Sequence, residues 1–318
     1  MATTARILVS PAEESHGWLP EGPRSFVFKG CDSLVWVNIQ HNATAKKGSI
    51  FVRDWETGEI SIHEQPARPG FVLPTDQPDC LFVGREKELG ILNVANGKWE
   101  SLALIPDGQE HTIINDGEVE PGGHAVVFGT KDVRFKEPIA HLYRYSMIDH
   151  RITFLADQQL CSNGKVFHQD HNGLILYDID TPKKTVVKYR YDTEQRRLHD
   201  EGVSIDLNDE PAFPDGMIDV GDGSVIIAFF NPHSGGDGVT RRYRLGSNAI
   251  VEEWITPGSP RVTCPLLVER ERRVQLVLTT AVEGMTAEIR SESPNAGALF
   301  IADTSLTALP DAELVQTK

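Results

Sequence analysis

At 318 residues the chain is long enough for two ordinary domains or one large all-β domain, and for a substantial buried core. Its 27 glycines, 19 prolines and 40% apolar residues are typical of a globular chain with many tight turns, which argues against disorder. The net charge of −15 supplies no basic surface that could neutralise phosphates, so we expect no nucleic-acid partner.

The N-terminal segment and the cysteines indicate where the protein is located and which cysteine-based sites it lacks. Met1–Gly17 has neither a basic start nor an apolar stretch of signal-peptide length, and no apolar run approaches the roughly 20 residues that cross a bilayer. The four cysteines are widely spaced, which disfavours a disulfide framework and a thiolate zinc site. We therefore predict a cytoplasmic protein without a membrane partner.

Short runs rich in Val, Ile, Phe and Trp, separated by polar turns, fill the first hundred residues and are typical of strands. The pattern restarts at Pro69, and Asn96–Gly97 is a hairpin-turn sequence. The strands expected here span residues 33–40, 48–55, 59–65, 80–84, 89–93 and 99–104.

The same pattern recurs along the rest of the chain. Six units begin near residues 21, 69, 113, 161, 212 and 260, at intervals typical of propeller blades. No amphipathic helix is expected between them. We predict that residues 1–318 form a single all-β domain, a six-bladed β-propeller. The apolar runs 33–40, 173–178 and 224–230 are then expected to be innermost strands, each preceded by a polar motif at one mouth of the central channel.

These polar motifs carry oxygen donors beside glycine. Because closing the ring gathers one end of every blade, we expect Glu21, Asn115, Asn163 and Asp215 to converge. Two carboxylates and an amide carbonyl suit Ca²⁺, Mg²⁺ or Mn²⁺, and Zn²⁺ less well. Such a cation can polarise a carbonyl or acidify a bound water, and an adjacent carboxylate can take the proton that the water loses. The pattern favours hydrolysis of an activated ester.

The motifs Pro20–Pro23, Asn115–Gly117, Ser162–Gly164 and Pro214–Met217 resemble, in order and spacing, those of the gluconolactonase, regucalcin and senescence-marker-protein family. The resemblance extends from about residue 21 to residue 304. It implies a six-bladed propeller that binds one divalent cation through Glu21, Asn163 and Asp215. Calcium is the expected metal, with magnesium, manganese and zinc as alternatives. The resemblance further implies that Asp215 is the general base for opening a sugar lactone, and that Asn115 contacts the substrate or a metal-bound water.

One position departs from this family. Members that open sugar lactones carry an Arg two residues before the Asn of the second of these motifs, where this chain has Ile113. The hydroxyls of a sugar need polar partners once water is excluded. We expect Lys131 and Lys136 to bind substrate instead, from a lid segment. Further candidates in the neighbouring polar segments are Arg134, His233 and Asp237.

Two other functions remain open. A non-catalytic propeller that binds calcium or a protein partner would have donors at the channel mouth that satisfy one another. An aryl-ester or phosphorus-ester hydrolase is favoured by the apolar Ile113. For a lactonase or for an ester hydrolase, the expected partner is a small lactone or ester substrate. Because a closed propeller needs no partner for stability, the expected state is a monomer or weak homodimer.

Overall fold

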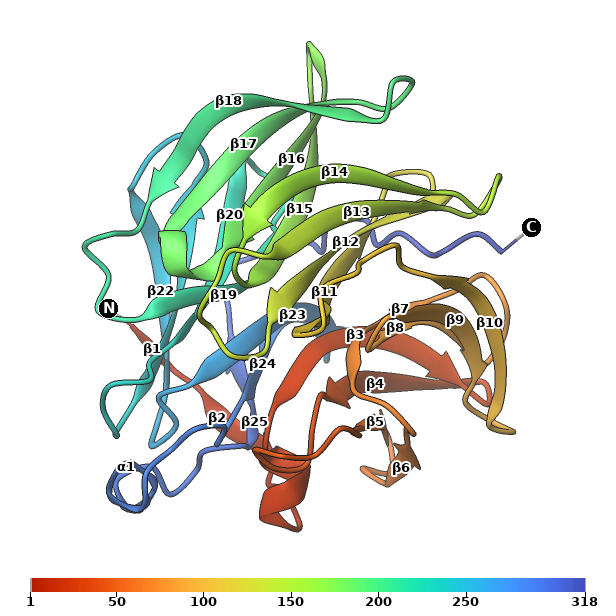
Figure 1. Cartoon of the computed structure of the whole chain (residues 1–318). Coiled ribbons are helices and arrows are strands. Elements are labelled where there is room, and N and C mark those ends of the chain that lie inside the picture. The colour runs from red at the N-terminus through yellow and green to blue at the C-terminus, as the bar shows by residue number, and fades with distance from the viewer. Residues whose placement is uncertain (1, 318) are drawn as a thin grey trace.

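Six antiparallel sheets form a ring in the computed structural model, which describes residues 2–317 (Figure 1). Blade 1 comprises β3 (Pro20–Phe28), β4 (Cys31–Asn38), β5 (Ser49–Asp54) and β6 (Ile60–Glu64). Blade 2 comprises β7 (Pro69–Pro74), β8 (Cys80–Arg85), β9 (Glu88–Asn93) and β10 (Lys98–Leu104). Blade 3 comprises β11 (Thr112–Val119), β12 (Ala125–Asp132), β13 (Ala140–Ser146) and β14 (Ile152–Gln159). Blade 4 comprises β15 (Ser162–Asp170), β16 (Gly173–Asp180), β17 (Thr185–Asp192) and β18 (Arg197–Asp206).

The last two blades take strands from the N-terminus. Blade 5 comprises β19 (Phe213–Asp219), β20 (Ser224–Phe230), β21 (Gly238–Arg244) and β22 (Ile250–Thr256), with β1 (Thr3–Thr4) added in parallel to β22. Blade 6 comprises β23 (Val262–Arg270), β24 (Arg273–Thr280) and β25 (Leu299–Asp303), with β2 (Arg6–Val9) as its outermost strand. The start of the chain therefore closes the ring against its end. The prediction of a six-bladed all-β propeller is confirmed.

Helical structure within residues 2–317 is limited to short segments. They are the 3₁₀ turns η1 (Glu14–Gly17) and η2 (Thr181–Lys183) and the helix α1 (Ala287–Ser291). The Thr286 hydroxyl caps α1 by accepting a hydrogen bond from Ile289 N. None of these helices is long and apolar enough to cross a membrane.

The second strand of each blade, and not the innermost one, carries the most continuous apolar sequence. Residues 225–229 of β20 are at most 1% exposed. A second strand is covered on both faces by the neighbouring blades, which requires apolar residues on both sides. The expectation that runs 33–40, 173–178 and 224–230 are innermost is therefore wrong. The innermost strands are the first strands of the blades, which contact one another around the axis and carry the polar motifs.

Every first strand has an irregularity near its start. The ladder to the second strand shifts register at Asn115, at Gly164 and across Asp215–Gly216, with similar shifts in the other three blades. A β-bulge of this kind redirects a side chain away from the ordinary alternation. It thereby aims a donor at the channel mouth from several blades.

Glycines beside these donors allow the first strands to approach closely. A Cβ on Gly164 would lie 2.7 Å from the backbone nitrogen of Met217 in the next blade. A Cβ on Gly216 would lie 2.8 Å from Cys264 Cα in the blade after that. The Asn-Gly and Asp-Gly motifs thus serve packing around the axis as well as turn formation.

The C-terminal segment returns to blades 2 and 3 near the opposite ends of their first strands. Val315 forms a parallel bridge with Thr75, and its side chain is fully buried against the core that contains Phe71. Gln316 N donates a hydrogen bond to Gly123 O at 2.9 Å. Each chain end therefore contacts two blades that are distant from it in sequence.

Candidate functional site

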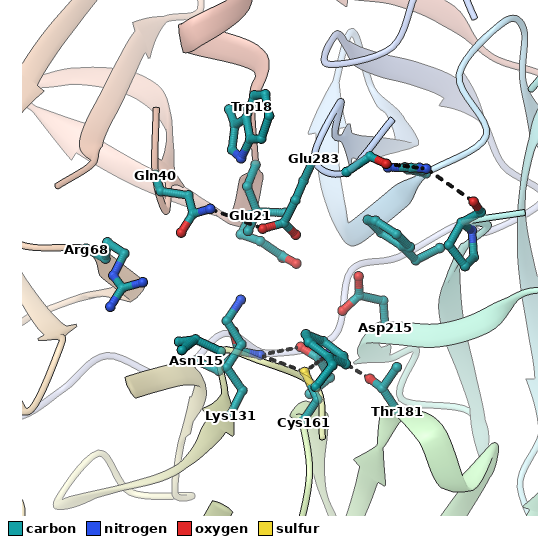
Figure 2. A pocket seen from close by; sticks show the side chains of 18 of the residues that line it. Trp18, Glu21, Gln40, Arg68, Asn115, Lys131, Cys161, Thr181, Asp215 and Glu283 are labelled. Carbon is teal, nitrogen blue, oxygen red and sulfur yellow. Dashed lines mark hydrogen bonds between the residues drawn. The ribbon is translucent and has the colours of Figure 1, made fainter. Parts of the chain in front are cut away.

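A cavity of about 900 Å³ lies at the end of the ring where the first strands begin. Of the residues predicted to form the site, five line this cavity: Glu21, Asn115, Lys131, Asn163 and Asp215. Glu21, Asn115, Lys131 and Asp215 extend toward a common space in Figure 2, from blades 1, 3 and 5. Residues separated by almost two hundred positions in sequence are therefore neighbours.

The two asparagines are held by a hydrogen-bond chain. Asn115 Nδ2 donates to Asn163 Oδ1 at 2.8 Å and to Ser162 O at 2.9 Å. Asn163 Nδ2 donates in turn to Thr181 Oγ1 at 2.7 Å. These bonds fix the orientation of both amides, so that Asn163 Oδ1 is aimed at Asn115 on the channel side. Asn115 Oδ1 accepts no hydrogen bond from residues 2–317 and is available to a ligand.

The two carboxylates, by contrast, lack strong partners. Glu21 Oε2 accepts a hydrogen bond from Gly22 N at 3.1 Å, and Asp215 accepts none from the described chain. Burial and the nearby negative charges of Asp215 and Asp116 raise the pKa of Glu21 well above its usual range. Burial also raises the pKa of Asp215, which Lys131 opposes. Two adjacent, poorly satisfied carboxylates favour a bound proton or cation.

Lys131 supplies the positive charge nearest to this pair. It lies opposite Ile113 in the β11–β12 ladder and is only 8% exposed. No carboxylate of the described chain is within ion-pair distance of its Nζ. Its charge nevertheless opposes the rise in the pKa of Glu21 and of Asp215. Ile113 is buried outside the cavity lining. The chain thus has a cation directly across the ladder from Ile113.

The other predicted substrate-binding residues lie outside the cavity lining. Lys136 is exposed, and its backbone N donates to Asp132 Oδ2. Arg134 pairs with Asp132 and Glu137. The ring of His233 packs against Phe213, and Asp237 accepts a hydrogen bond from Gly258 N. The segment that carries Arg134 and Lys136 does reach the cavity, through Val133 and Phe135.

The donor set fits a hard divalent cation better than zinc. Within residues 2–317 no three His, Cys, Asp or Glu side chains cluster as metal ligands, so a cation would depend on two carboxylates and amide oxygens. Oxygen donors alone suit Ca²⁺, Mg²⁺ or Mn²⁺. Glu21 and Asp215, whose pKa values are raised, are also the groups that such a cation would stabilise most.

Comparison with known proteins identifies the family. Residues 19–282 match the SMP-30/gluconolactonase/LRE-like region. The chain belongs to this family. It is 26% identical to the L-arabinolactonase of Azospirillum brasilense over 90% of both chains, and 27% identical to the regucalcin of Danio rerio over 84% of this chain and 85% of that protein. The structure of a calcium-binding regucalcin of Agrobacterium tumefaciens superposes with a TM-score of 0.81 at 19% identity, covering 99% of each chain, and shows the same fold.

This family member has several cavity residues that the sequence motifs did not reveal. Glu283 accepts a hydrogen bond from Gln40 Nε2 at 3.3 Å, and Arg261 lines the same wall. Trp18, Phe213 and Phe230 add aromatic surface. None of these residues is in an Asn-Gly or Asp-Gly motif. Two of them stand at recognisable positions: Arg261 immediately precedes the first strand of blade 6, and Phe213 is the first residue of the first strand of blade 5.

Proposed function

We propose that this protein is a divalent-metal-dependent lactonase, with a small lactone as substrate. The observation that carries the proposal is the carboxylate pair Glu21 and Asp215, which together accept one hydrogen bond from the described residues, beside Asn115, Asn163 and Lys131 in one cavity. Membership of a family that includes an L-arabinolactonase relative supports the reaction type.

Glu21, Asn163 and Asp215 would hold the cation. When bound, it would polarise the lactone carbonyl and lower the pKa of a water molecule. The regucalcin of Agrobacterium tumefaciens is a calcium-binding protein, and the oxygen donors of this cavity are compatible with calcium. The bound charge would also keep both carboxylates ionised, because it offsets the burial that raises their pKa.

Asp215 would act as general base. Its carboxylate takes a proton from the attacking water as the oxygen–carbon bond to the lactone carbonyl forms. The ring C–O bond then breaks, and the proton passes from Asp215 to the departing ring oxygen, which gives the hydroxy acid. Lys131 and the free Asn115 Oδ1 would orient the ring hydroxyls of the substrate. Burial of Lys131 strengthens its interaction with an oxygen acceptor.

A second substrate class has its own support. The aromatic residues Trp18, Phe213 and Phe230 line the cavity. An aryl ester would gain apolar contacts with these rings. Aryl and phosphorus esters therefore belong in the substrate panel beside aldonolactones.

The test compares Asp215→Asn with Asp116→Asn. Asp116 is a neighbouring carboxylate on β11 that lies outside the cavity lining. We expect kcat for opening of aldonolactones to fall by at least about 100-fold in Asp215→Asn, because a general base contributes at least this much to the rate. In Asp116→Asn we expect kcat to fall by less than about tenfold. Each variant is assayed with EDTA and with added Ca²⁺, Mg²⁺, Mn²⁺ or Zn²⁺.

Undiminished turnover in Asp215→Asn would remove the proposed base. Metal analysis of the same preparations separates the non-catalytic alternative. A stoichiometric divalent cation with no turnover of any lactone or ester would favour a calcium-binding propeller over an enzyme. The hydrogen bond from Asn115 to Asn163 meets the expectation for that alternative. Glu21 and Asp215 do not meet it, because neither accepts a hydrogen bond from another donor of the site among the described residues.

A further inference from the structure

Arg261 is a buried cation without a carboxylate partner among residues 2–317. It lies immediately before β23, is 2% exposed and lines the cavity. Burying a guanidinium costs several kcal/mol of solvation, which proteins normally offset by pairing it with an anion. The other buried or half-buried arginines of blades 2, 3 and 5 follow that rule. They pair as Arg68–Glu86, Arg144–Glu120 and Arg242–Asp222.

The hydrogen bonds of Arg261 leave most of its donors free. Nη2 donates to Pro232 O at 3.2 Å and, more weakly, to Gly284 O at 3.5 Å. Nε is buried without an acceptor, and Nη1 makes no hydrogen bond to residues 2–317. Glu283 is the anion that most affects Arg261, but it is beyond ion-pair distance. The guanidinium also packs over Phe230, 5.3 Å from the ring centroid.

The propeller repeat places Arg261 at the depth of the metal-site residues. Arg261 bridges to Phe230 in blade 5, as Cys161 of blade 4 bridges to Lys131 in blade 3. Ala281 N donates to Arg261 O, and Thr181 N donates to Cys161 O, each at 3.0 Å. Arg261 and Cys161 are thus equivalent positions. Cys161 Sγ is 3.5 Å from Asn163 Nδ2, so Arg261 begins at the same level of the channel mouth.

We propose that Arg261 is an anion-binding subsite that selects lactones carrying a carboxylate or phosphate substituent. This proposal rests on the lactonase function proposed above and names its substrate class. The substituent would accept hydrogen bonds from the free guanidinium donors while the lactone carbonyl lies beside Asp215 on the neighbouring blade. A cavity of about 900 Å³ has room for both groups of one substrate.

The experiment measures three lactones of similar size. They are the neutral D-glucono-1,5-lactone, the carboxylated D-glucaro-1,4-lactone and the phosphorylated 6-phospho-D-glucono-1,5-lactone. In Arg261→Met we expect KM for at least one anionic lactone to rise by about 10- to 100-fold, because a charge-assisted hydrogen bond to the substrate is lost. KM for the neutral lactone should change by less than about threefold. The two anionic arms tell carboxylate from phosphate.

Arg68→Met is the matched control. Arg68 also lines the cavity, but Glu86 neutralises it through two hydrogen bonds of 2.6 and 3.0 Å. We expect this variant to leave the preference for the anionic lactone intact. If Arg261→Met does not fold, Arg261→Lys carries the same comparison, because lysine keeps the charge and has fewer donors. An equal rise in KM for neutral and anionic lactones would overturn the proposal.

A binding measurement keeps this inference separable from the lactonase function. Titration calorimetry compares glucarate, a sugar dicarboxylate, with glucitol, its neutral polyol. Tighter binding of glucarate that Arg261→Met abolishes supports the anion subsite even if none of the lactones is hydrolysed, in which case only the proposed reaction fails. If neither glucarate nor 6-phosphogluconate, titrated in the same way, binds more tightly than glucitol, the subsite is refuted whatever the enzyme activity.

Discussion

Glu21 and Asp215 should leave a signature in the pH dependence of stability. Their pKa values are raised in the folded state, mainly by burial, so the folded protein binds these protons more tightly than the unfolded chain. The free energy of unfolding therefore falls as pH rises from the ordinary carboxyl pKa near 4 through the raised values. The metal-free protein therefore carries more of this penalty at neutral pH than at pH 4.

We expect Glu21→Gln to stabilise the protein in EDTA at pH 7.5, by about 1–3 kcal/mol, because one of two adjacent buried charges is removed. The gain should vanish near pH 4, where the parent is protonated, and added Ca²⁺ should reverse it. Urea unfolding between pH 4 and pH 8 measures this, with the exposed Glu56→Gln as control. A gain that did not depend on pH would contradict the linkage argument.

The site residues that sequence could predict are those marked by local backbone requirements. Asn163 and Asp215 stand beside glycines that the packing of adjacent first strands requires, so the motif is visible in the chain. Arg261 and Glu283 carry no such mark, and only the closed ring brings them to the cavity. Lys131 was inferred from the missing Arg at position 113, and its partner in the ladder is that same Ile113.

A turn that the Asp132 carboxylate stabilises forms part of the cavity wall. The Asp132 carboxylate accepts hydrogen bonds from the backbone N of Arg134, Lys136 and Glu137 at 3.0–3.2 Å. Burial opposes its ionisation, but these bonds and the Arg134 guanidinium outweigh burial and lower the pKa of Asp132 well below its usual range. The turn holds Phe135 at a positive φ of 51° in the cavity lining.

Asp132→Ala should loosen this segment. We expect a loss of about 2–4 kcal/mol of stability and a several-fold higher KM, because Val133 and Phe135 are no longer held at the cavity. Asp54→Ala is the matched control, since Asp54 caps a similar turn in blade 1 by accepting from Glu56 N and Thr57 N. That variant should lose stability without a change in KM. Equal KM effects would show that the Asp132 turn does not shape the site.

The strands themselves differ in how far sequence defines them. The run 224–230 was predicted with the bounds that β20 has, because a strand buried on both faces is a continuous apolar run between turns. Its place as the second strand was missed, since periodicity does not report which neighbour covers which face. The short strand β2 was not predicted, because Arg6–Val9 is only four residues long and pairs with residues almost three hundred positions away.

For the whole molecule, closure of the ring gives the site its geometry. The donors come from blades 1, 3, 4 and 5, and Arg261 comes from blade 6, so their separations depend on how the blades pack and not on any one loop. Blade 6 is complete only when β2 pairs with β25, in a register that joins Arg6 to Ile301 and Ile7 to Phe300. The first residues of the chain therefore contribute to a site that they do not touch.

Deleting residues 2–9 should open this closure. The deletion removes β2, uncovers the edge of β25 and takes Leu8 and Val9 from the core formed by Trp36, Leu299 and Ile301. We expect a loss of several kcal/mol of stability, on the order of 3–5, together with association through the exposed edge.

Deleting residues 2–4 is the control. It removes only the two-residue strand β1 and should cost about 1 kcal/mol. Urea unfolding and light scattering measure both effects. Equal stability of the two deletions would mean that the ring is held closed by contacts between the blades alone.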